Sequence, residues 1–218
     1  MEWGDLTEIT LRSLAVSVSA TGLAALVAMP FGAWLAIQPF RGRRWAIATL
    51  NALIGIPPVV VGLIVYLLLS RSGPFGVLGL LFTPWAMILA QVVIITPLIA
   101  SLTHQVVRDL WLQYRDLLVS MNTTRRQRLG ILLRDGQRGL MTAGLAGFGR
   151  AIGEVGAIMI VGGNIDHATR VLTTAITLET SKGNLWFAVT LGAVLIVLSL
   201  TVSLGAHALS RGERRAQW

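Results

Sequence analysis

The chain has 218 residues, of which 54% are hydrophobic and 13% are charged. A soluble domain carries about a quarter charged residues, so this composition argues against a soluble enzyme and indicates a membrane protein. There is no cysteine, which excludes disulfides and thiol chemistry. The net charge of +8 at pH 7 would, taken alone, fit nucleic acid or anionic lipid as a partner.

Five stretches are apolar and about 20 residues long or longer, the length with which a helix crosses a bilayer. We therefore predict an all-α, polytopic transmembrane bundle that forms one domain over residues 1–218. The first stretch is not predicted to be a signal peptide, because its N-terminal flank is acidic and its apolar run is too long. The five predicted spans are 11–37, 45–69, 80–102, 140–162 and 185–206.

The placement of the basic residues predicts the orientation of these spans. Thirteen of the eighteen bases lie in the loop after the first span, the loop after the third, and the C-terminal tail with Arg211, Arg214 and Arg215. This predicts a multi-pass protein of the cell (inner or plasma) membrane, with its N-terminus outside and its C-terminus in the cytoplasm. Nucleic acid is rejected as a partner, since the bases are scattered over three segments without interleaved aromatic residues.

Prolines interrupt the second and third predicted spans. Pro57 and Pro58 lie inside the second, and Pro84 and Pro97 lie near the ends of the third. Proline removes a helix hydrogen bond and bends the helix. Two interpretations remain open: tolerated kinks in a packed bundle, or helices that bend around a central cavity.

The fourth predicted span carries one base and one acid, Arg150 and Glu154, among glycines. Charges are costly in hydrocarbon, and residues four apart share a helical face, so the two are predicted to pair. A structural interhelical pair is favoured, supported by the close approach that Gly149 and Gly153 allow. The alternative is a charged element near a translocation route. Arg150 is not assigned as a substrate ligand, because Glu154 cancels much of its field.

The loop at about 105–138 has leucines at helical intervals among polar residues, and Asn122-Thr-Thr can cap a new helix. It is predicted to form two short surface helices joined by a turn. A solvated basic face would explain the charge, but the length and apolar content of the loop favour a docking surface for a cytoplasmic partner.

A second loop, 168–181, has the pattern of an amphipathic helix near the outer interface. Its apolar face is formed by Val171, Leu172, Ala175 and Ile176. Hydroxyl groups can donate hydrogen bonds to an oxyanion at a pore mouth, and a threonine-rich surface helix is the alternative. The candidate residues for this path are Thr173, Thr174 and Thr177.

Catalytic, cofactor-binding and metal-binding residues are not predicted. The sequence has no P-loop, its only lysine is Lys182, and its three histidines lack ligand spacing. The chain is therefore not expected to be an enzyme, and energy for transport would come from another subunit or from an ion gradient.

Several motifs now suggest a family. They are IPPVVVG at 56–62, FGRAIGEVGA at 148–157, VGGN at 161–164 and TTAITLETSKG at 173–183. With them the chain resembles the permease subunits of ABC importers for tetrahedral oxyanions, most closely the tungstate type. The resemblance implies a homodimer in the lipid membrane, a cytoplasmic ATP-binding subunit and an external oxyanion-binding protein.

The resemblance also implies where the ATP-binding subunit docks. The family motif of Glu-Ala-Ala followed by a glycine and a proline falls on Asp116-Leu117-Leu118, Asn122 and Asp135, where only the acid is retained in kind. Asn tolerates the left-handed turn that glycine would supply. The implied coupling residues are Asp116, Leu117, Leu118, Asn122, Arg125 and Arg126.

Other functions remain open at this point. The same kind of permease could carry molybdate or sulfate. A secondary transporter or channel working alone would use Arg150 and Glu154 as a gradient-coupled site. A scaffold without transport activity fits the kinked, glycine-rich bundle poorly.

Overall fold

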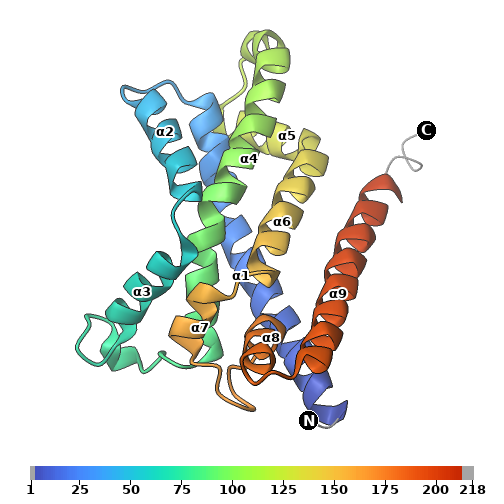
Figure 1. Ribbon diagram of the computed structural model, residues 1–218. Helices are drawn as coiled ribbons and strands as arrows, with labels where there is room; N and C mark the ends of the chain where they lie inside the picture. Colours follow the sequence, from blue (N-terminus) through green and yellow to red (C-terminus); the bar gives the residue numbers. More distant parts are fainter. Residues whose placement is uncertain (1–2, 213–218) are drawn as a thin grey trace.

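The computed structural model describes residues 3–212, with side chains described for residues 6–205. Over the described backbone the chain is helical without strands, which confirms the all-α prediction (Figure 1). Of the predicted basic tail, Arg214 and Arg215 lie outside the described residues. The helices are α1 (Trp3–Ile37), α2 (Arg43–Ile54), α3 (Pro58–Leu69), the 3-10 turn η1 (Gly76–Leu78), α4 (Pro84–Ser120), α5 (Arg125–Asp135), α6 (Gln137–Ile152), α7 (Gly156–Gly162), α8 (Leu172–Ser181) and α9 (Leu185–Gly212).

Three helices, α1, α4 and α9, are long and apolar enough to cross a membrane singly. Two bent pairs, α2 with α3 and α6 with α7, raise the number of candidate spans to five, in agreement with the prediction. The start of α1 lies at the end of the bundle that carries α3, α7 and α8, and α9 runs toward the opposite end, which carries α5 (Figure 1). The orientation relative to the cytoplasm stays a prediction.

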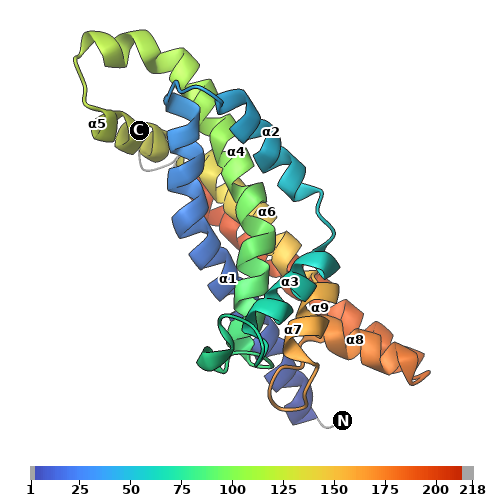
Figure 2. The same cartoon turned by 90° about the vertical axis from the view of Figure 1, so that its left-hand side faces the viewer.

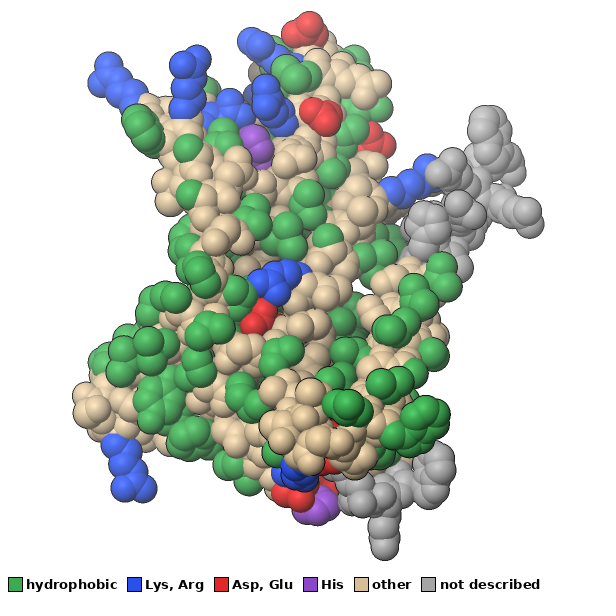
Figure 3. All heavy atoms as spheres, viewed as in Figure 1, with side chains coloured by type: hydrophobic (Ala, Val, Ile, Leu, Met, Phe, Trp, Pro, Cys, Tyr) green, Lys and Arg blue, Asp and Glu red, His purple; other side chains and the backbone are tan. Residues whose placement is uncertain are grey.

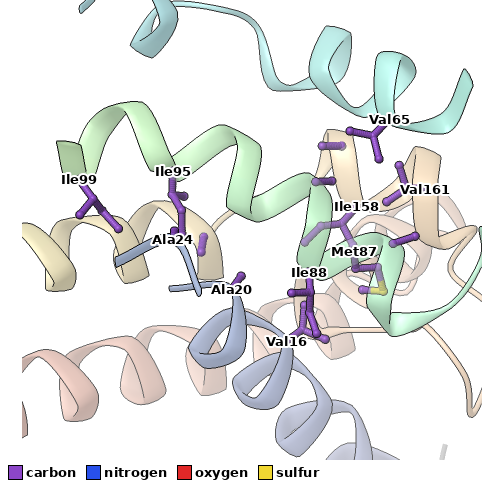
Figure 4. Packing of buried hydrophobic residues seen from close by; sticks show 14 of the residues in the cluster. Val16, Ala20, Ala24, Val65, Met87, Ile88, Ile95, Ile99, Ile158 and Val161 are labelled. Carbon is purple, nitrogen blue, oxygen red and sulfur yellow. The ribbon is translucent and has the colours of Figure 1, made fainter. Parts of the chain in front are cut away.

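Helices α1 and α4 pack side by side at the centre of the bundle (Figures 1 and 2). Small residues make this close approach possible: Ala20, Ala24 and Ala28 recur every fourth residue on α1 and are fully buried. A Cβ atom on Gly32 would lie 2.4 Å from the carbonyl oxygen of Ala100. Figure 4 shows Ala20 and Ala24 in the same apolar cluster as residues of α4.

The second predicted span, 45–69, bends at the prolines that the sequence marked, and the bend divides it into two helices. It bends by 96° between α2 and α3. Helix α2 ends at Ile54, and Pro58 is the first residue of α3, where a missing N–H costs nothing. The fourth predicted span, 140–162, is also broken, with a bend of 62° between α6 and α7.

The short helices that follow the two bends, α3 and α7, pack against each other. A Cβ atom on Gly62 of α3 would lie 2.6 Å from the Cα of Ala157 on α7, so only glycine fits there. Val65 of α3 and Ile158 and Val161 of α7 lie in the same buried cluster (Figure 4). The two halves therefore form one packed element between two bends.

Helix α4 continues well past the predicted end of the third span at residue 102. It begins at Pro84, accommodates Pro97 and ends at Ser120. Beyond the span it packs on α5 through Val107, Leu118 and Leu132. The two helices predicted for the 105–138 loop are thus the end of α4 and the separate helix α5.

The contact between α3 and α7 predicts a sharp difference between two glycines. Gly62→Ala should destabilise the protein by about 1–3 kcal/mol, because the added methyl group meets backbone atoms of Ala157. Gly22→Ala, on α1 with nothing within 4 Å of the new Cβ, should be neutral or stabilise by up to about 1 kcal/mol. Unfolding in mixed detergent micelles measures both. Equal effects would show that α3 and α7 do not meet at Gly62.

Candidate functional site: the joint between α6 and α7

The Arg150–Glu154 pair lies at the break in the fourth span. Arg150 Nη1 donates to Glu154 Oε2 at 2.8 Å, so the predicted pairing is confirmed. The expected setting is wrong, however, because Arg150 is in the last turn of α6 and Glu154 is in the break. Figure 3 shows charged side chains mainly at the two ends of the molecule, with a basic and an acidic side chain together midway along this face.

The two charges complement the helix ends beside them. Arg150 lies at the C-terminus of α6, where the helix dipole is negative, and Glu154 precedes the N-terminus of α7, where it is positive. Glu154 Oε1 also accepts from the backbone N–H of Ala157, at 3.3 Å. The side chain of Glu154 is 6% exposed and that of Arg150 is 40% exposed, so the acid is held inside while the base reaches outward.

Two further side chains bind the backbone of the break. Gln91 of α4 donates its Nε2 to the carbonyl of Ala151 at 2.8 Å, and Thr173 of α8 donates its hydroxyl to the carbonyl of Glu154 at 2.9 Å. A broken helix in lipid must satisfy its freed carbonyls from neighbouring elements. Gln91 was not among the predicted site residues. The sequence could have indicated it, because Gln91 is the only residue with an amide side chain in the third predicted span, and polar residues in a membrane span are often functional.

A small cavity lined by both polar and apolar side chains adjoins this joint. It is lined by side chains that include Gln91, Thr173, Ser13 and Ser17, and its volume of about 10 Å³ is room for one water molecule. Gln91 Oε1 is buried without a hydrogen-bond partner among the described residues. In this conformation the cavity is too small for a tetrahedral oxyanion.

The three threonines predicted to line a path are placed differently from one another. Thr173 and Thr174 are buried, with 6% and 0% exposure, and Thr177 is exposed. The Thr174 hydroxyl accepts from the N–H of Val171 at the start of α8, and the Thr177 hydroxyl donates to the carbonyl of Thr173. The buried face of α8 therefore includes Thr173 and Thr174 in addition to the apolar residues that the sequence pattern assigned to it. A role of these hydroxyls in a path stays a prediction.

The first turns of α1 fix the loop that leads into α8. Ser13 Oγ accepts from the N–H of Leu172 at 2.7 Å, and Arg12 donates to the carbonyl of His167 at 2.8 Å. Glu8 Oε2 lies 2.9 Å from His167 Nδ1. From the sequence, the acidic flank before the first span served only as an argument that this span is not a signal peptide. The structure shows that one of its acids, Glu8, also helps to hold the loop before α8.

The other end of α8 is held by a buried carboxylate. Glu179 is 7% exposed, and it accepts from Lys182 Nζ at 2.9 Å and from Asn184 Nδ2 at 3.0 Å. The hydrogen bond from Lys182 lowers the pKa of Glu179 below its ordinary value of 4.5, and this outweighs the opposing effect of burial.

The turn between α4 and α5 has the predicted geometry. Asn122 adopts the left-handed conformation, with φ of +54°. Thr124 then caps α5, since its hydroxyl accepts from the N–H of Gln127, whose side chain accepts in turn from the N–H of Thr124. The turn survives without the glycine of the family motif.

The predicted coupling residues divide into two groups around this turn. Leu118 is 4% exposed and packs with Leu132, so it holds α4 against α5 and is not open to a partner. The others are exposed and available for docking: Asp116, Leu117, Asn122, Arg125 and Arg126.

The Arg150–Glu154 pair can be tested by a double-mutant cycle. Removing one partner of a buried ion pair costs about 3–5 kcal/mol of stability, whereas an exposed ion pair contributes less than about 1 kcal/mol. In this pair the acid is buried and the base is partly exposed, so we expect a coupling energy of about 1–2 kcal/mol. Glu154→Ala, Arg150→Ala and the double variant would be unfolded in mixed micelles. Strictly additive effects would mean that the two charges are not coupled.

The lowered pKa of Glu179 predicts a pH-dependent contribution to stability. Because the folded-state pKa is depressed, the carboxylate stabilises the fold fully above pH 4.5, and this contribution is lost as the pH falls through the folded-state pKa. The melting temperature of Glu179→Gln should therefore be below that of the parent at neutral pH, and the difference should close below pH 4.5. A difference that stays constant down to pH 3 would contradict this.

Comparison with known proteins gives a consistent family. Residues 28–215 match the model of the binding-protein-dependent transport system inner membrane component. A "Probable anion ABC transporter permease protein" of Haloferax volcanii is 41% identical, over 96% of this chain and 93% of its own. Two further relatives are named "Tungstate uptake system permease protein TupB". The one of Peptoclostridium acidaminophilum is 37% identical, over 92% of this chain and 88% of its own. The one of Campylobacter jejuni is 34% identical, over 79% of this chain and 72% of its own.

These matches cover nearly the whole length of the chain, including both broken spans and the turn between α4 and α5. Together with the multi-pass helical bundle, they place the protein in the inner membrane as a transport component. The chain belongs to the family of binding-protein-dependent transport system inner membrane components, the permease subunits of ABC transporters.

Proposed function

We propose that this chain translocates a tetrahedral oxyanion, tungstate, as the permease of an ATP-driven importer. The observation that carries the proposal is the name of two relatives, tungstate permeases that are 37% and 34% identical over most of both chains. Relatives named for molybdenum and sulfate transport are more distant, at 25–28% identity.

The arrangement of the helices supports alternating access. Many secondary transporters have discontinuous helices near the middle of the membrane, and their alternating access is largely a rigid-body movement of one part of the bundle against another. Here α3 and α7 are halves of such discontinuous helices, joined by the contact of Gly62 with Ala157. We expect them to move as one unit, bending at residues 55–57 and 153–155.

ATP hydrolysis is assigned to a separate cytoplasmic subunit. The turn between α4 and α5 projects from one end of the bundle (Figure 2). Beside it, in the last turn of α4, Leu117 is exposed among charged residues, with 58% of its surface accessible. An exposed leucine among charges fits a protein contact. The proposed complex contains two copies of this chain, the ATP-binding subunits and an external oxyanion-binding protein.

Proteoliposomes test this proposal. Permease with its ATP-binding subunit and a saturating binding protein should take up tungstate in an ATP-dependent manner. Preferred uptake of molybdate or sulfate would reassign the substrate. Uptake driven by an ion gradient without ATP would favour a secondary transporter.

A pair of variants tests the docking role of the turn. Leu117→Asp should abolish co-purification with the ATP-binding subunit and reduce uptake at least tenfold, because it places a charge at the centre of an apolar contact. Gln105→Asp adds the same charge at an exposed site on the same helix, about three turns nearer the bundle, and should leave both unchanged. Retained co-purification of Leu117→Asp would place the docking site elsewhere.

A further inference from the structure

A groove rich in arginine lies at the end of the bundle that carries the turn between α1 and α2. Its volume is about 570 Å³, and it is lined by the end of α1, the start of α2, the far part of α4 and the start of α5. Figure 3 shows the basic side chains gathered at this end of the molecule. The arginines in the lining are Arg43, Arg108, Arg115, Arg125 and Arg128, and the lining contains no acid.

Two of these arginines are already engaged by the fold. Arg43 donates to the carbonyls of Leu35 and Ala36, which closes the end of α1. Arg128 donates to the Thr123 hydroxyl and lies over the ring of Trp111, with 5.8 Å from its guanidinium carbon to the ring centroid.

The other three, Arg108, Arg115 and Arg125, are exposed, and within residues 6–205 they form no ion pair and no side-chain hydrogen bond. Arg125 is also one of the implied coupling residues, so the inference rests on Arg108 and Arg115. The three charges converge from α4 and α5 on one groove. An anion with several oxygens is the ligand that such free guanidinium groups fit best.

The surroundings of the groove indicate the depth of lipid headgroups. Ile37, Leu112 and Val119 give it an apolar wall beside the arginines. Next to it, the rings of Trp34 and Phe40 stack with centroids 5.3 Å apart, and both are about 40% exposed. Tryptophan is enriched at membrane–water interfaces, and basic pockets between helices at that depth bind anionic headgroups.

We infer that this groove is a binding site for the phosphate headgroup of an anionic phospholipid. Because its walls come from the α1–α2 turn, α4 and α5, a bound lipid would hold the end of α4, which carries the exposed Leu117, against the other two elements. The inference depends on the membrane location of the chain and not on its substrate.

The test compares two double variants of the purified permease in neutral detergent, titrated with phosphatidylglycerol and with phosphatidylcholine and followed by native mass spectrometry. Arg108→Gln/Arg115→Gln should weaken phosphatidylglycerol binding roughly thirtyfold. Each base contributes about 1 kcal/mol to the binding of an anionic lipid, and the loss of two, about 2 kcal/mol, corresponds to that factor. Arg134→Gln/Arg138→Gln removes the same charge at the same end of the molecule but outside the groove, and should leave binding unchanged. Phosphatidylcholine should bind weakly to all.

Three outcomes would overturn the inference. Equal weakening by both double variants would mean that diffuse positive charge holds the lipid. Competition by inorganic phosphate or tungstate as effective as that of phosphatidylglycerol would identify a site for free oxyanions. Unchanged lipid binding with loss of the ATP-binding subunit would make the groove a protein contact.

Discussion

The break between α6 and α7 exposes backbone groups that neighbouring helices must satisfy. Inside a membrane no water is available to satisfy the backbone groups that a broken helix exposes. Three elements supply the missing partners: Glu154 accepts from the start of α7, Gln91 of α4 donates to Ala151, and Thr173 of α8 donates to Glu154. The break can exist only because α4 and α8 lie against it.

This arrangement explains a costly feature of the sequence. A lone carboxylate at this depth would be strongly unfavourable. Glu154 is instead paired with Arg150 and placed between two helix ends whose dipoles favour the charges beside them. The pair thus complements the two helix ends that meet at the joint, and Arg150 is exposed on its other side. The same polar joint gives α7 a fixed start, from which it packs on α3.

Local rules predicted much of this fold and missed the parts that depend on distant partners. The spans, the left-handed Asn122 and the pairing of Arg150 with Glu154 follow from hydropathy, turn chemistry and spacing. Pro57 and Pro58 marked the first bend, whereas the second contains no proline, so its pattern is that of a continuous helix. Its carbonyls are held by residues 60 and 19 positions away, and the burial of Leu118 depends on Leu132 of another helix.

We expect α3 and α7 to move as one unit between two bends, and a disulfide between them provides a test. The chain has no cysteine, and a Cβ on Gly156 would lie 3.7 Å from the Cβ of Val59, within disulfide range. Val59→Cys/Gly156→Cys should cross-link on oxidation, and ATP-dependent uptake should then equal that of the same protein after reduction. Uptake that is lost on oxidation and restored by reduction would show that α3 and α7 slide past each other, which contradicts this account.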